Sequence, residues 1–418
     1  MNQPIHPLGE IARHSDGTTS LRFERELAGS AERAWRALTE SEQLRHWMPC
    51  DIIGPRETGA EVAAPFWEDV VRKYGIEDTV LAGRIVTWDP SSTFAWEWDD
   101  ELLTFSLEPT PTGTHLTLTI DLGDKSPEVH QVAAGYHMCL DQLCALVDTD
   151  NPPPFIDVDP SRYEVAYAGF PRSANYDPVW VVEHMMGPNP LWLTESLSGC
   201  MDLDSTMRVL DLGCGRALSS IFLAKEFGVQ VWAADLWIDA SDNLDRIRAA
   251  GVEDKVFPIR AEAHELPFAD GFFDAVVCVD AYHYFGTDDL YLEQHLARLI
   301  QPGGQLGIVV PGLVEELTSN AVPAHLQQYW EPALFSFHSP AWWQRHWERS
   351  GLVDVELADL MPDGWRHWMA SDLSWSEHLG KPSDEADMLA GDQGQTLGLT
   401  RVVARRNDRP TARLAELQ

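Results

Sequence analysis

The sequence predicts two domains of different fold class, an α+β domain followed by an α/β domain built on a parallel sheet. At 418 residues the chain exceeds what one hydrophobic core usually organises. Strand-like segments follow one another early in the chain, whereas short apolar runs alternate with helix-length segments later. A stretch with three consecutive prolines among acids separates the two patterns. We therefore expect domains over residues 1–150 and 161–418, joined by a linker over residues 151–160.

The N-terminal domain is predicted to contain a strand, a helix, a meander and a second helix. Residues 21–27 alternate apolar and polar side chains, and Ser30 then stands as a candidate N-cap before apolar residues at helical spacing. A long amphipathic run over residues 128–147 closes the domain. Between the two helix candidates lie four strand candidates, which turn residues separate from one another. They are residues 81–90, 92–100, 102–110 and 114–122.

Three segments of this domain resemble a known family. They read AERAWRALTESEQLRHWM, GRIVTWDPSSTFAWEW and AAGYHMCLDQLCALV, and through them residues 20–148 resemble the START-like superfamily, in its branch related to activators of a heat-shock ATPase. The resemblance implies a helix-grip fold, in which a curved antiparallel sheet grips a long helix, often around an apolar pocket. It therefore implies an apolar ligand. Tyr136 stands where the pattern usually has Trp, which alters the expected cavity.

The second domain is predicted to be a parallel α/β sheet. Short apolar runs separated by helix-length segments are typical of that architecture. A further strand candidate over residues 396–405 follows an insertion over residues 313–379. The runs lie at residues 207–213, 229–235, 255–261, 273–280 and 304–310.

The loop after the first of these strands indicates the ligand. Residues 209–217 read VLDLGCGRA, and Leu218 stands where the G-x-G-x-x-G loop of dinucleotide-binding proteins requires its third glycine. The spacing fits G-x-G-x-[G/A] instead, with Asp211 two residues ahead of the first glycine. This is the first motif of class I S-adenosylmethionine-dependent methyltransferases, which residues 160–418 resemble. The resemblance implies a Rossmann-like fold with S-adenosylmethionine as cofactor.

The chemistry of the motif suits this cofactor. Asp211 can face the cationic methionine amino group, directly or through water, and glycines let the backbone approach without Cβ clashes. Asp235 ends the second strand, where an acid can accept both ribose hydroxyls, and Leu236 can pack on the adenine.

The segment after the third strand, RAEAHELPF, is similar to the family segment in which an acid reaches the adenine amine. Glu262 occupies that position, and the Ala263 backbone is available to a ring nitrogen. Singly, each feature is also consistent with a tight turn or a solvated acid, but together they stand in the family's order. The predicted cofactor contacts are Asp211, Gly213, Cys214, Gly215, Asp235, Leu236, Glu262, Ala263 and Asp280.

The methyl acceptor is expected beyond the fourth strand, beside residues 280–285. His283 is the candidate catalytic residue, as a general base or an orienting group, and Tyr282 and Tyr284 are candidates for a partly apolar wall. A packed or capping histidine is the alternative. In-line methyl transfer depends mainly on positioning, so few catalytic side chains are needed.

Aromatic residues are expected to cover the site or to fill a core. Tyr176, His184 and Met185 are lid candidates ahead of the first strand, with a helical core as the alternative. The same two interpretations apply to seven tryptophans of the insertion, among which residues 339–351 predict a helix capped by Ser339. These are Trp330, Trp342, Trp343, Trp347, Trp365, Trp368 and Trp375.

Composition bounds the partners and the compartment. The formal net charge of −36 argues against nucleic acid and anionic membranes as partners. The six cysteines form neither a C-x-x-C pair nor a zinc-type cluster, so we expect reduced thiols and no metal site. The N-terminus lacks the pattern of a secretory signal, and we expect a cytoplasmic protein.

The prediction is an S-adenosylmethionine-dependent methyltransferase that acts on a small-molecule acceptor, with a START-like domain ahead of it. Three alternatives stay open at this point. The second domain could catalyse another transformation from the same cofactor, such as cyclopropanation of a lipid. The cofactor domain could be a sensor while the START-like domain carries the main function. The N-terminal domain could bind a chaperone or another partner protein.

Overall fold

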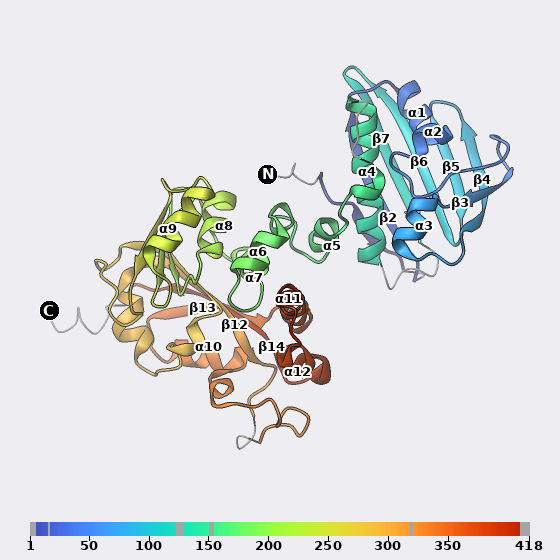
Figure 1. The fold of residues 1–418 in the computed structure, drawn as a ribbon. Coiled ribbons are helices and arrows are strands. Elements are labelled where there is room, and N and C mark those ends of the chain that lie inside the picture. Colours follow the sequence, from blue (N-terminus) through green and yellow to red (C-terminus); the bar gives the residue numbers. More distant parts are fainter. Residues whose placement is uncertain (1–5, 16, 123–128, 150–153, 318–320, 410–418) are drawn as a thin grey trace. The chain divides into compact units, whose positions relative to one another are not determined.

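The structure is a computed structural model that describes residues 6–15, 17–122, 129–149, 154–317 and 321–409 (Figure 1). Contacts divide the chain into two compact units, Met1–Asn175 and Tyr176–Gln418. Both predicted fold classes are confirmed: the first unit has an antiparallel sheet and a long helix, and the second has a Rossmann-like α/β sheet. Residues 151–153 of the expected linker lie outside the described residues.

One antiparallel sheet of seven strands organises the first unit, in the order β1-β2-β7-β6-β5-β4-β3. Its strands are β1 (Glu10–Arg13), β2 (Thr19–Leu27), β3 (Glu61–Pro65), β4 (Val80–Asp89), β5 (Thr93–Trp98), β6 (Glu101–Thr110) and β7 (Gly113–Asp121). Its helices are α1 (Ala31–Thr39), α2 (Ser41–Leu44), α3 (Glu68–Tyr74), α4 (Val129–Thr149) and α5 (Ser161–Tyr167), with short turns η2 (Phe155–Asp157) and η3 (Ser173–Asn175).

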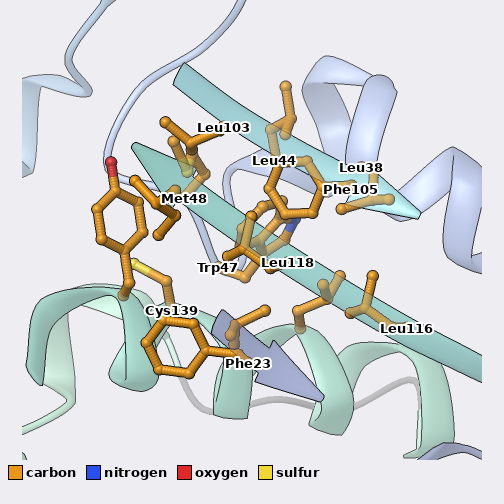
Figure 2. Packing of buried hydrophobic residues seen from close by; sticks show 14 of the residues in the cluster. Phe23, Leu38, Leu44, Trp47, Met48, Leu103, Phe105, Leu116, Leu118 and Cys139 are labelled. Carbon is orange, nitrogen blue, oxygen red and sulfur yellow. The ribbon is translucent and has the colours of Figure 1, made fainter. Parts of the chain in front are cut away.

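The core of the first unit lies between the sheet and α4. Every second side chain of β2, β6 and β7 is buried, as the period of two along a strand requires. Figure 2 shows Phe105 and Leu118 from neighbouring strands in one cluster with Trp47, and Cys139 from α4. The Ser30 side chain accepts the N–H of the third helical residue and caps α1, as predicted.

A buried polar group stands within this core. The Tyr136 hydroxyl of α4 donates to Glu101 and accepts from Trp98 Nε1 at 3.0 Å, and the same Nε1 lies 3.1 Å from Glu101 Oε2. Burial, followed by the Glu101 charge, raises the pKa of Tyr136 well above its ordinary value. Tyrosine in place of the family's tryptophan thus supplies a hydroxyl to a buried carboxylate.

The first unit extends beyond the expected linker because α5 packs on α4. The Tyr163 hydroxyl donates to Asp141 Oδ2 at 3.2 Å, and the Tyr167 hydroxyl lies 3.1 Å from His137 Nδ1. Both tyrosines are buried. Residues after the prolines therefore belong to the first core, which the composition of the segment does not reveal.

The second unit contains a seven-stranded sheet in the order β10-β9-β8-β11-β12-β14-β13. Strands β8 to β12 pair in parallel, and β14 is antiparallel to both of its neighbours. The runs predicted from residue 207 to residue 310, and the candidate over 396–405, are all strands. Their bounds are β8 (Arg208–Leu212), β9 (Gln230–Asp235), β10 (Val256–Arg260), β11 (Phe273–Val279), β12 (Ile300–Leu313), β13 (Val353–Leu360) and β14 (Leu397–Arg406).

Helices complete the second unit. Ser339 caps α10 by accepting from Trp342 N, as the sequence predicts. The insertion after β12 holds an additional strand, β13, beside α10 and α11. The helices are α6 (Pro178–His184), α7 (Pro190–Ser198), α8 (Leu218–Phe227), α9 (Ala240–Ala249), α10 (Pro340–Glu348), α11 (Gly364–Leu379) and α12 (Asp384–Asp392), with short turns η4 (Tyr282–Tyr284), η5 (Leu292–Leu296), η6 (Ala297–Leu299) and η8 (Pro332–Ser336).

The cysteines and the helix lengths bear on chemistry and environment. All six cysteines are free thiols, and five of them are buried. In the part of the chain that the structure describes, no helix combines the length and apolar character that a membrane crossing requires.

Candidate active site

A cavity of about 340 Å³ opens in the second unit, where the parallel strands end. The residues that follow β8, β9, β10 and β11 line it, together with the loop between α6 and α7. The order of the strands reverses between β8 and β11, and open α/β sheets bind ligands in the crevice at such a switch point. The volume lies within the range of small-molecule sites.

The glycine loop between β8 and α8 forms one wall. Gly213 and Gly215 have φ angles of 74° and 53°, a region that favours glycine. A Cβ atom at Gly213 would clash with Ala281, which follows β11. Cys214, buried between the two glycines, also lines the cavity. The path of the loop itself therefore requires glycine, in addition to the access that a ligand needs.

Asp235 ends β9 and joins two loops of the site. Its Oδ2 accepts from Gly215 N at 2.8 Å, and its Oδ1 accepts from the backbone N–H groups of Trp237 and Ile238 at 2.7 and 3.0 Å. The carboxyl lines the cavity although the residue is buried. Since a carboxylate accepts about four hydrogen bonds, it retains capacity for a ligand hydroxyl. The neighbouring Leu236 lines the cavity as well and is 47% exposed.

Asp211 lies within β8, behind the cavity wall. Its Oδ2 accepts from the hydroxyls of Ser219 and Ser220 in α8, and its Oδ1 has no hydrogen-bond partner among the described residues. Burial raises the pKa of Asp211 to about 6, although the two hydroxyls act in the opposite direction. Asp211 does not itself line the cavity, and its contact with the cofactor, directly or through water, stays a prediction. The carboxyl anchors the first turn of α8 behind the glycine loop.

Glu262 follows β10, and His264 engages its carboxylate. The His264 Nδ1 lies 2.7 Å from Glu262 Oε1, and the His264 backbone N–H donates to Oε2 at 2.9 Å. Both side chains line the cavity with Ala263, whose carbonyl accepts from the Tyr291 hydroxyl at 3.2 Å. Burial acts to raise the pKa of Glu262, but the contacts with His264 outweigh it and lower that pKa. His264 lies within the segment RAEAHELPF but was not among the predicted site residues.

Asp280 follows β11 and lines the cavity from the other side of the switch point. Its φ angle of 54° is left-handed, and its N–H donates to Val309 O at 2.8 Å. Its carboxyl makes no hydrogen bond or ion pair within the described part of the chain, and a Cβ atom at Gly187 would clash with it. Burial, and then the nearby Glu385, raise the pKa of Asp280 to about 8.

Two residues of the next turn, Tyr282 and His283, do not line the cavity, which favours the packed alternative for the histidine. Tyr282 is fully buried, with its ring 5.6 Å from the rings of both Trp343 and Trp347. His283 is also buried, packs edge-on against Phe337 and does not line the cavity. Burial lowers the pKa of His283 to about 4. Both residues belong to the η4 turn, and their side chains are buried whereas that of Tyr284 is exposed.

Tyr284 is the one member of the predicted aromatic group that lines the cavity. It is 59% exposed and meets Trp237 edge-to-face at 5.7 Å between ring centroids. Trp237 is itself 66% exposed and was not predicted. These two rings, with the exposed Met186, give the cavity an apolar rim. Large apolar side chains that remain exposed at a cavity are a usual sign of a ligand surface.

The loop between α6 and α7 covers part of the cavity. His184 and Met185, two of the lid candidates, line it. Tyr176 instead donates to Glu226 at 3.0 Å. None of the seven tryptophans of the insertion lines the cavity, and Trp343, Trp347 and Trp368 are buried, so the structure supports packing rather than a cage.

The fold and the cavity define a class of protein. A sheet of this strand order, with a glycine loop after β8 and acids at the ends of β9 and β11, is the architecture of the class I methyltransferases. A family model described as "Methyltransferase domain" matches residues 209–304, and one described as "Activator of Hsp90 ATPase homolog 1-like protein" matches residues 28–148.

The relatives agree with these matches. "Methyltransferase GfsG" of Streptomyces halstedii is 30% identical over 211 residues, which cover 47% of this chain and 68% of that protein. The chain belongs to the methyltransferase family. "Glycine/sarcosine/dimethylglycine N-methyltransferase" of Actinopolyspora halophila is 26% identical over 167 residues, or 40% of this chain and 29% of that protein. A solved geranyl diphosphate C-methyltransferase of Streptomyces coelicolor, in complex with S-adenosyl-L-homocysteine, covers 52% of this chain and 79% of its own at 16% identity, with a TM-score of 0.40.

S-adenosylmethionine is the cofactor of this family, and the cavity suits it. Asp211 Oδ1, which has no partner among the described residues, is a buried acceptor behind the glycine loop, where the cofactor brings a cationic amino group. The Asp235 carboxylate keeps acceptor capacity for ribose hydroxyls, and Glu262 has acceptor oxygens for an exocyclic amine. The donor set therefore fits a nucleoside joined to an amino acid. Arg216 also lines the cavity, and its guanidinium donates to Glu183 O at 2.9 Å.

Proposed function

We propose that residues 176–418 transfer a methyl group from S-adenosylmethionine to a small-molecule acceptor in this cavity. The observation that carries the proposal is the cavity at the switch point, with the glycine loop and Asp235 on one side and Asp280 on the other. The volume of about 340 Å³ suits a small ligand rather than a polymer. The curated relatives described above also include an enzyme of small amines.

Specific roles follow for the residues of the site. Asp235 accepts the ribose hydroxyls, Glu262 accepts from the adenine amine while His264 holds its carboxylate, and the glycine loop lets the amino-acid end approach. When bound, the cofactor supplies an electrophilic methyl group. The protein then orients the acceptor in line with that group and excludes water, so its contribution is mostly positional.

Calorimetry with the full chain tests the assignment. We expect binding of S-adenosylmethionine and S-adenosylhomocysteine but not of a nicotinamide dinucleotide. Asp235→Ala removes charge-assisted hydrogen bonds and should weaken cofactor binding by about tenfold or more. Asp235→Asn, which keeps one acceptor oxygen for the loops, separates the loss of charge from the loss of loop support. The matched control is Asp242→Ala, an exposed acid in the first turn of α9. Unchanged affinity in both Asp235 variants would remove the ribose assignment.

For the first unit we propose binding of an apolar ligand. A cavity of about 240 Å³ next to α3 supports the proposal, since Trp67, Val70 and Phe155 give it an apolar wall. The polar residues Arg45, His46 and Asp69 line it as well. Mass spectrometry of the full chain under native conditions should detect a copurified apolar molecule. Trp67→Ala should release that molecule without loss of S-adenosylhomocysteine binding. A ligand-free protein, or one whose ligand survives this substitution, would contradict the site.

A further inference from the structure

Asp280 differs from the other acids of the cavity. Protein groups hold the carboxylates of Asp235 and Glu262, whereas no group of the described residues holds that of Asp280. The described residues contribute no hydrogen bond and no ion pair to it, although it lines the cavity. Its left-handed backbone and the absence of a side chain at Gly187 leave room for the carboxyl at this place. A partly buried carboxyl without a partner costs stability, and such costs concentrate at functional sites.

No positive group faces Asp280 among the described residues. The titratable groups that interact with it are Cys278 in the preceding strand, Tyr284 in the next turn and Glu385 on α12. The pKa values of Cys278 and Tyr284 are raised, so both stay neutral near neutral pH and only Glu385 can add a negative charge. Glu385 accepts a hydrogen bond from Trp368 at 2.9 Å. Within the described part of the chain, no arginine or lysine compensates the Asp280 charge. A cation would have to come from a ligand.

Aromatic side chains line the same cavity, and one of them, Tyr284, interacts with Asp280. Tyr284 and Trp237 meet edge-to-face and both are mostly exposed. Rings of this kind attract an ammonium group and also pack against the apolar body that carries it. A neutral hydroxyl would leave an ionised Asp280 uncompensated, whereas an ammonium group would pair with it.

We propose that Asp280 binds the methyl acceptor and that the acceptor presents an aliphatic amine to it. This inference rests on the proposed methyltransferase function and names its substrate class. In each turnover the amine nitrogen, bound as an ammonium group, gives one proton to the Asp280 carboxylate. The nitrogen–carbon bond then forms as the carbon–sulfur bond of the sulfonium breaks, and the electron pair of that bond stays on sulfur. The proton leaves Asp280 for solvent.

The test uses the full chain saturated with S-adenosylhomocysteine and two probes of equal shape, 2-phenylethylamine and 2-phenylethanol. At about pH 9, with Asp280 ionised, we expect the amine to bind at least about tenfold more tightly than the alcohol by calorimetry. Asp280→Asn should reduce this preference to less than roughly threefold. Asparagine tolerates the left-handed backbone as aspartate does, so this variant removes charge without adding strain.

Two further variants, together with the measured binding of S-adenosylhomocysteine, separate a failure of this inference from a failure of the proposed function. Glu385→Gln should weaken amine binding by a smaller factor, and it serves as the test if Asp280→Asn does not fold. Asp242→Asn, the exposed control on α9, should leave the preference intact. Absence of S-adenosylhomocysteine binding in the wild type would overturn the proposed function itself. Three outcomes with normal cofactor binding would overturn only the inference. They are equal affinity for the two probes, no binding of the amine, and an amine preference that stays intact in Asp280→Asn.

Discussion

At the scale of single residues, Asp280 links the site to stability. Its pKa of about 8 in the folded chain lies above the ordinary aspartate value of 3.8, so between these pH values the folded state holds a proton that the unfolded state has lost. The stability of the protein should therefore fall as the pH rises from about 4 to about 8, at up to roughly 1.4 kcal/mol per unit.

Asp280→Asn removes this dependence. The variant should gain stability over the wild type by a few kcal/mol at about pH 9 and by much less at about pH 5. Calorimetric scans of both proteins at the two pH values provide the measurement. A difference between variant and wild type that does not change with pH would show that Asp280 is ionised at both.

His283 gives the opposite dependence. Its pKa of about 4 lies below the ordinary histidine value of 6.5. Between these two pH values the unfolded state binds a proton on this histidine and the folded state does not. Stability should fall as the pH drops from about 6.5 to about 4, by roughly 2 to 3 kcal/mol in total.

We expect His283→Gln to lose less stability on acidification than the wild type. Its affinity for S-adenosylhomocysteine should stay within about twofold of the wild type, because the ring does not line the cavity. A large loss of cofactor binding in a variant that still folds would instead indicate that His283 takes part in the site.

Much of the site could be read from the sequence, but the direction of several side chains could not. An acid at the end of a parallel strand lies at the carboxyl edge of the sheet. Once the strands were recognised in the sequence, this rule placed Asp235, Glu262 and Asp280 at the cavity. Asp211 precedes the end of β8, so the neighbouring helix covers it. The turn after β11 sends Tyr282 and Tyr284 in different directions, and no periodicity in so short a segment indicates which one reaches the cavity.

At the scale of elements, the grip of the sheet on α4 includes the hydroxyl of Tyr136. Tyr136→Phe would remove the donor to the buried Glu101 and leave that acceptor less satisfied, at a cost of about 1.5 to 3 kcal/mol. In a calorimetric scan of the full chain, the transition of the first unit should move to lower temperature.

The matched control for this change is Tyr74→Phe, at the exposed C-terminal end of α3. It should leave the scan unchanged. Equal scans for Tyr136→Phe and the wild type would mean that water replaces the lost hydroxyl.

Most elements follow from their apolar period, and the ones that were missed lack it. Strand β13 reads VDVELADL and lies at the sheet edge with most side chains partly exposed, so acids interrupt its apolar pattern. Strands β1 and β3 are short edge strands of the first sheet. Such strands depend on a neighbour that the local sequence does not specify.

At the scale of the whole molecule, the division at Asn175 predicts how the chain can be cut. A piece of residues 1–175 keeps α5 on α4, whereas a piece of residues 1–150 exposes the surface around His137 and Asp141. We expect the two compact units to fold when expressed apart. The longer N-terminal piece should melt at a higher temperature than the shorter one.

Circular dichroism of the separate pieces measures this difference. Insolubility of residues 176–418 alone, beside a soluble full chain, would mean that the units share a core. Equal melting of the two N-terminal pieces would mean that α5 adds nothing to the first unit.

The position of β14 bears on the order in which the protein can assemble during synthesis. Strand β14, residues 397–406, lies between β12 and β13 in the sheet. The ribosome makes β14 after both of these strands, so one edge of each stays unpaired until β14 is synthesised. Until it emerges, the nascent chain presents an unpaired strand edge beside apolar residues, which is a site for pairing with other chains. A chain truncated before residue 397 should therefore have a folded N-terminal unit and a second unit that aggregates. We expect chaperones and proteases to remove such a chain, so that truncation leaves no partly active protein.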